Sequence, residues 1–132
     1  MATTTATLTL SSADLTGDAL SLSTTTTLTK AGTVTGLNQT TGVARKTTAA
    51  TSQYVLFDGD AYGNGSHKVY IKNTSTVATE YVTIEINSEQ MGKLYAGDWC
   101  FFPWEANADT NDIKLTPSVG TAFTVEYALF YE

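Results

Sequence analysis

The segment from His67 to Ile86, HKVYIKNTSTVATEYVTIEI, constrains the fold of this chain more than any other. Apolar and polar residues alternate in two runs, and a period of two is typical of β-strands that bury one face. The apolar members of the two runs are Val69, Ile71, Val82, Ile84 and Ile86. Between the runs, residues 73–79 are mostly Asn, Thr, Ser and Ala, and the polar members of this set favour a turn. The segment therefore predicts a β-hairpin with one buried aliphatic face.

Threonine accounts for 26 of the 132 residues, and its β-branched side chain suits a pleated, half-exposed surface better than a helix. Further strand-like runs occur at residues 53–57, 99–104, 112–117 and 122–131. Turn residues separate such runs at intervals of about 8–12 residues, which is typical of sandwiches and barrels. We predict an all-β fold, an antiparallel β-sandwich that is jelly-roll-like.

The first fifty residues are rich in Thr, Ser and Ala, with leucines at strand-like intervals. Gly, Pro and charged residues are too scarce there, and the aliphatic residues too regular, for a typical disordered linker. We interpret residues 1–50 as an extended, Thr-rich N-terminal β segment or arm, and residues 51–132 as the sandwich core. The alternative is a single domain over residues 1–132, in which this segment joins its own sheet.

Charge and residue types argue against several classes of function. The net charge of −6 disfavours direct binding to nucleic acid, because phosphate recognition needs clustered Lys and Arg. No run is long and apolar enough to span a membrane, and the N-terminus lacks a secretory signal. His67, the only imidazole, is expected at the surface, and Cys100 is expected to be buried and inert. The sequence therefore predicts neither an enzyme nor a cofactor.

Two loops are rich in acidic and amide side chains. The first, DGDAYGNGS, begins like a calcium loop of the EF-hand type, with Asp58, Asp60 and Gly63 in suitable positions. The match then ends, because Tyr62 and Val69 stand where oxygen ligands are required. The second loop, residues 107–112, matches no better. We interpret both loops as turns between strands and predict no metal site.

Aromatic residues crowd the segment from Trp99 to Trp104, WCFFPW, and alternation places them on both faces of a strand. Such a strand is either central to a two-layer core or presses one face on a partner. An alternative of another class is a carbohydrate-binding β-sandwich module, in which aromatic side chains stack on sugar rings. The aromatic residues open to that interpretation are Trp99, Trp104, Tyr95 and Tyr62.

Three segments, HKVYIKNTSTVATEYVTI, GKLYAGDWCFFPW and IKLTPSVGTAFTVEYALFYE, resemble the C-terminal parts of small virion structural proteins of tailed bacteriophages, especially marine phages. The resemblance covers residues 53–132 best. It implies a capsid decoration (cement) protein on the head surface, assembled in the host cytoplasm, with the major capsid protein and copies of itself, as a homotrimer, as partners. A tail or fibre-associated role is the alternative within the same class.

We expect the contacts of such a protein to flank the His67–Ile86 segment. The N-terminal arm, residues 2–35, would add strands to a neighbour through backbone hydrogen bonds. The strand from Trp99 to Trp104 would supply apolar surface. The predicted interface residues are Leu8, Leu10, Leu20, Leu22, Leu28, Arg45, Trp99, Phe102 and Trp104.

Overall fold

The computed structural model describes residues 3–15, 17–107 and 109–132, without the side chain of Asp109. Ala2, where the predicted arm begins, and Thr16 within it lie outside the described residues. The chain divides into two compact units, Met1–Asn38 and Gln39–Glu132. The division follows Asn38 rather than residue 50, because Ala44–Thr48 pairs along its whole length with the last strand of the second unit.

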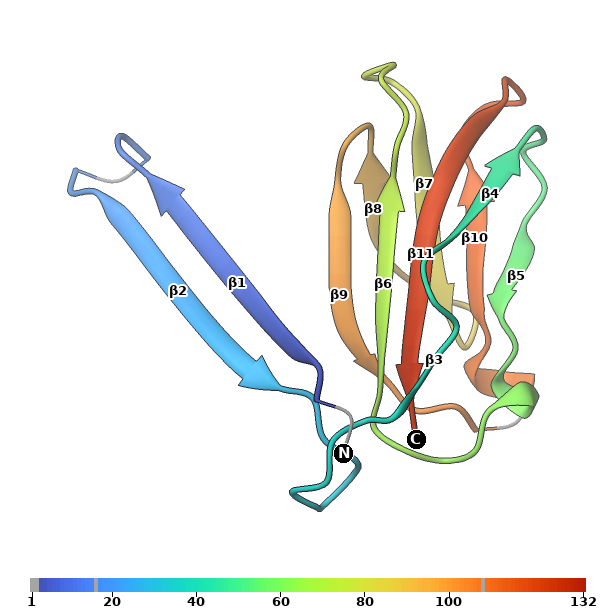
Figure 1. The fold of residues 1–132 in the computed structure, drawn as a ribbon. Coiled ribbons are helices and arrows are strands. Elements are labelled where there is room, and N and C mark those ends of the chain that lie inside the picture. Colours follow the sequence, from blue (N-terminus) through green and yellow to red (C-terminus); the bar gives the residue numbers. More distant parts are fainter. Residues whose placement is uncertain (1–2, 16, 108) are drawn as a thin grey trace. The chain divides into compact units, whose positions relative to one another are not determined.

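The first unit contains a two-stranded antiparallel ribbon, drawn in blue in Figure 1. Its strands are β1 (Thr5–Ser12) and β2 (Leu20–Thr27), and they pair over their full length with Leu10 opposite Leu22. The Leu28 N–H donates to the Thr4 carbonyl and extends the ladder by one pair. The regular spacing of the leucines, which predicted a strand, therefore corresponds to one side of a hairpin ribbon.

The second unit is an antiparallel β-sandwich, which confirms the predicted all-β class (Figure 1). One sheet has the order β5-β10-β7-β8, and the other has β3-β11-β6-β9 with β4 also on β11. The strands are β3 (Gln39–Thr40), β4 (Ala44–Thr48), β5 (Tyr54–Phe57), β6 (His67–Asn73), β7 (Tyr81–Ile86), β8 (Glu89–Tyr95), β9 (Trp99–Trp104), β10 (Ile113–Pro117) and β11 (Phe123–Tyr131). Two single turns of 3₁₀ helix, η1 (Gly59–Ala61) and η2 (Asp109–Asn111), lie in the connections.

Strand pairing in the sandwich is nested about one tight turn. β7 pairs with β8 through a two-residue connection, Asn87 and Ser88, whose φ angles of 53° and 62° suit the primed turns of β-hairpins. Outward from this turn, β6 pairs with β9, β5 with β10 and β4 with β11. The first four strands of this nest, β4–β7, therefore pair antiparallel with the last four, β8–β11, in reverse order. The resulting long double strand folds over to form the two sheets.

The predicted hairpin over His67–Ile86 is wrong in its pairing, although its buried face is right. β6 and β7 lie in different sheets, so the two strands face each other across the core instead of sharing a ladder. The inward residues Val69, Ile71, Val82 and Ile84 are at most 2% exposed. The alternation of apolar and polar residues shows which side of each strand is buried. It contains no information about which strands are hydrogen-bonded neighbours.

Asn73 holds the crossing from β6 to β7. Its side chain is fully buried, and its amide nitrogen donates to the carbonyls of Glu80 and Leu94, each at 3.1 Å. Its amide oxygen accepts from the Ser75 N–H at 2.9 Å. One side chain therefore satisfies backbone groups of the crossing itself and of β8 in the opposite sheet. Buried backbone groups need such partners where the ladder ends.

We predict that Asn73→Ala lowers the free energy of unfolding by about 2–4 kcal/mol, because it leaves buried backbone groups without partners. Urea denaturation followed by tryptophan fluorescence measures the change. Thr76→Ala is the matched control, since Thr76 is exposed in the same crossing and should change stability by less than about 0.5 kcal/mol. Equal midpoints for the two variants would contradict the role of Asn73.

Candidate functional site

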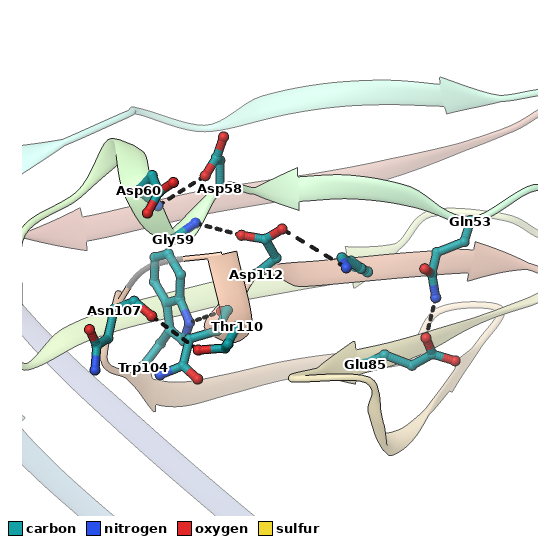
Figure 2. Close-up of polar contacts among 11 residues, drawn as sticks. Gln53, Asp58, Gly59, Asp60, Glu85, Trp104, Asn107, Thr110 and Asp112 are labelled. Carbon is teal, nitrogen blue, oxygen red and sulfur yellow. Dashed lines mark hydrogen bonds and ion pairs between the residues drawn. The ribbon is translucent and has the colours of Figure 1, made fainter.

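The two acidic loops lie together at one end of the sandwich, where η1 and η2 are close to each other (Figure 2). The Asp58 carboxylate accepts from the Asp60 N–H at 2.9 Å, which closes the first turn of η1. The Asp112 carboxylate accepts from the Gly59 N–H at 2.8 Å and lies 3.9 Å from the Lys114 ammonium. These two carboxylates therefore bind backbone of their own chain.

Trp104 supports the second loop from the core side (Figure 2). Its indole N–H donates to the Asn111 carbonyl at 2.8 Å, and the Asn111 amide donates to the Glu105 carbonyl at 3.1 Å. Over residues 3–15, 17–107 and 109–132, no three His, Cys, Asp or Glu side chains gather in a way that could hold a metal ion. The side chains of Asp58, Asp112 and Asn111 therefore act in turn closure and loop anchoring.

His67 is fully buried, which corrects the expectation of a surface residue. Its Nε2 lies 2.7 Å from the Gly63 carbonyl, as a donor would, and its ring is surrounded by aromatic rings. Those of Tyr62, Trp104 and Tyr131 lie 6.4, 5.9 and 6.3 Å away between centroids. A side chain with no exposed area cannot reach a substrate, so His67 serves to pack and anchor the turn that precedes β6.

The predicted interface leucines of the arm fall on one face of the β1–β2 ribbon. Leu10, Leu20 and Leu22 are 47%, 39% and 46% exposed, and Leu8 is half-buried. Leu28 follows β2 and is buried, so it is not available to a partner as predicted. The cross-strand register places only Thr and Ser on the opposite face of the ribbon. The ribbon is therefore amphipathic, with an exposed apolar side.

Arg45 is exposed but already paired within its own sheet. Its guanidinium bonds the Glu126 carboxylate, 2.9 Å from Nη2 and 3.0 Å from Nε. The hydroxyl of Tyr70 donates to the other oxygen of Glu126 at 3.1 Å. These two hydrogen bonds to the ionised form lower the pKa of Glu126. A partner that recruited Arg45 would compete with Glu126.

The strand β9 turns its two tryptophans to opposite sides. Trp99 is 52% exposed on the outer face, opposite Lys72 of β6. Phe102 and Trp104 are 7% and 4% exposed and belong to the core, which corrects their assignment to an interface. They point inward because β9 is paired with β6, whose Val69 stands opposite Phe102.

The aromatic residues considered for sugar stacking do not form one surface. Trp104 lies in the core, and Tyr62 is half-buried against it. Tyr95 is 44% exposed in β8, where its ring packs on that of Tyr81 at 5.0 Å. Trp99 is exposed in β9, which belongs to the other sheet. A stacking platform of the predicted four residues is therefore absent.

Sequence reasoning missed two features: Asn73, which it treated as part of a turn, and the free edges of the ribbon. A sequence signal was available for the two strands of the ribbon, though not for their edges. At the odd positions 5–11 and 21–27 every residue is Thr or Ser, whereas leucine occupies even positions. This alternation indicates two strands with matched faces, and only the pairing in the structure shows that their outer edges are free.

Comparison of the chain with known protein families, with curated proteins and with solved structures finds no match. In the part of the chain that the structure describes, no helix is long and apolar enough to cross a membrane.

We predict that Trp104→Ala destabilises the protein by about 3–5 kcal/mol, because it removes a core ring and the bond to Asn111. Trp99→Ala, the matched control on the same strand, should change stability by less than about 0.5 kcal/mol. Thermal and urea unfolding of both variants gives the comparison. Similar losses for both would show that Trp99 is covered in the folded protein.

We predict that Cys100 reacts slowly with thiol reagents, since burial raises its pKa from 9.0 to about 11. Two pKa units reduce the thiolate fraction about 100-fold at pH 8. Alkylation by iodoacetamide should therefore be at least about 100-fold slower in the native protein than in urea-unfolded protein at that pH. Equal rates in the two states would contradict this placement of the thiol.

Proposed function

We propose that this chain is a structural protein of a bacteriophage virion, a capsid decoration (cement) protein that binds the head surface and stabilises it through subunit contacts. The observation that carries the proposal is the amphipathic ribbon, β1–β2, which belongs to the separate compact unit Met1–Asn38 and has exposed leucines. The sandwich fits the proposal as the folded body to which the ribbon is attached. The Asp58 and Asp112 carboxylates of its loops bind backbone N–H groups, and its histidine is buried.

The ribbon has the properties of a binding arm. An isolated two-stranded sheet is at best marginally stable in water, and this one leaves three leucines 39–47% exposed. Full burial of a leucine stabilises by about 1.5–3 kcal/mol, so a partner that covers this face stabilises the arm as well as the complex. Symmetric assemblies repeat such contacts, so that each of them can be modest.

We further propose that the sandwich is a jelly roll. The nested pairing about the Asn87–Ser88 turn supports this, because a jelly roll can be described as a long double strand wrapped into two sheets. The resemblance to phage virion proteins covers residues 53–132 best, which hold β5–β11, so it concerns the sandwich and not the arm. It is the source of the proposed partners, which are the major capsid protein and copies of this chain in a homotrimer.

A tail or fibre-associated position is the second candidate, and the same ribbon would serve there. When particles are taken apart, a decoration protein stays with the heads, whereas a tail or fibre-associated protein stays with the tails. Separation of heads from tails, followed by mass spectrometry of each fraction, should place the chain with heads. Recovery with tails alone would favour the second candidate.

We predict that deletion of residues 2–35 abolishes incorporation into particles, because it removes both strands of the ribbon. The sandwich should still fold, since its core cluster lies between Phe57 and Leu129. Particle-bound protein is measured by mass spectrometry, and folding of the truncated chain by its thermal transition. Leu10→Lys should also weaken incorporation, whereas Val34→Lys, at a side chain that is 94% exposed and outside both strands of the ribbon, is the matched control. Normal incorporation of a folded, truncated chain would contradict the proposed arm.

A further inference from the structure

Both outer edges of the β1–β2 ribbon carry unpaired backbone groups. Over the described residues, β1 pairs only with β2 and β2 only with β1. The Leu28 N–H bonds the Thr4 carbonyl, so that pair is hydrogen-bonded. Bonded and non-bonded pairs alternate in an antiparallel ladder. The outward-pointing N–H and C=O groups therefore belong to Thr5, Thr7, Thr9 and Ser11 on β1, and to Ser21, Ser23, Thr25 and Thr27 on β2.

The side chains agree with this alternation. Non-bonded pairs bring side chains closer together than bonded ones do. The hydroxyls of Thr7 and Thr25 lie 2.8 Å apart, and those of Thr9 and Ser23 lie 3.4 Å apart. The residues of the hydroxyl face are therefore the same residues that present free backbone groups at the edges. The backbone of the leucine face is directed into the ribbon.

These edges lack four common protections against strand addition. Natural proteins guard exposed edges with charge, proline, bulges or short strands. The sandwich does so: β5 has four residues, β4 carries Arg45 and Lys46, and β9 carries Pro103. β1 and β2 have eight residues each, and neither holds a charged residue or a proline or shows a register shift.

We infer that the ribbons of separate copies of this chain pair edge to edge, with β1 of one copy against β2 of the next. Such a contact keeps leucines beside leucines and hydroxyls beside hydroxyls, and no charge on either strand opposes it. If the copies are related by rotation about an axis along the ribbon, the new pair is antiparallel, as β1–β2 already is. The contact is then head-to-tail and uses both edges, so a ring can close with the leucine faces inward.

A second copy fits these edges better than an unrelated chain. The two edges are matched in length and in hydroxyl content, and each copy supplies both of them. A ring of ribbons therefore leaves no unpaired strand edge, which a one-sided partner would not achieve. The inference concerns the protein in solution and does not depend on the virion role.

Proline substitution tests each edge separately. Thr9→Pro removes one outward N–H of β1, and Ser23→Pro removes one outward N–H of β2, while the hydrogen bonds between β1 and β2 keep all their donors. Thr9→Val and Ser23→Val are the matched controls, because each loses the same side-chain hydroxyl but retains the N–H. Light scattering coupled to size exclusion gives the molar mass of each protein across a dilution series.

We expect the wild-type chain and both valine variants to share a mass of several chains, and each proline variant alone to have the mass of one chain. A mixture of the two proline variants should form a two-chain complex, since one retains its β2 edge and the other its β1 edge. Complex formation would also show that both ribbons remain folded. A monomeric wild type, a proline variant with wild-type mass, or a mixture without a complex would each overturn the inference. Incorporation into particles is a separate measurement, so the two proposals can fail independently.

Discussion

The sandwich depends on the register that begins at the Asn87–Ser88 turn. Because β4–β7 pair in nested order with β8–β11, a change at this turn is transmitted to every later pair. Side chains alternate between faces with a period of two, so a slip of one residue would turn the core residues outward. Both turn residues have positive φ, which matches the twist of the strands that they join. Two register shifts, at Ile84/Glu85 and Ile113/Lys114, adjust the ladder without loss of the inward pattern.

Polar side chains anchor the connections between the two sheets. Asn73 secures the crossing from β6 to β7, and Trp104, with the Asp112 carboxylate, secures the loops that hold η1 and η2. In each case a side-chain group meets backbone that has left its ladder. Unpaired backbone inside a protein costs about as much as a lost hydrogen bond, so a sandwich with many crossings needs such residues. This requirement explains why conspicuous Asp, Asn and Trp side chains serve structure here.

The sequence was sufficient for most strands of the sandwich and their buried faces, but it missed β4 and β8 and did not give the neighbour of each strand. The alternation in β6 shows which of its sides is buried. The buried side of β7 could pack beside it in the same sheet or against it from the opposite sheet, and the alternation is the same in both cases. Alternation places Trp99 and Trp104 on opposite sides of β9. Because both sides of this strand carry aromatic residues, the sequence did not show which side faces the core. His67 is different, because it shares the face of Val69 and Ile71, so alternation placed it inward and only its polarity suggested the surface. The free edges of the ribbon were missed because they are a property of pairing, which the pattern does not contain.

The two units differ strongly in their content of charged residues. Of the twenty charged residues, only Asp14, Asp18 and Lys30 precede Asn38, and none of the three lies in β1 or β2. The sandwich carries the remaining charge, with a negative excess, and like charge on two copies disfavours close approach of their sandwiches. The ribbon has no such repulsion, and its hydroxyl face keeps it hydrated without charge. Among the described residues, the ribbon therefore combines free strand edges with an absence of charge, and both favour the proposed association there.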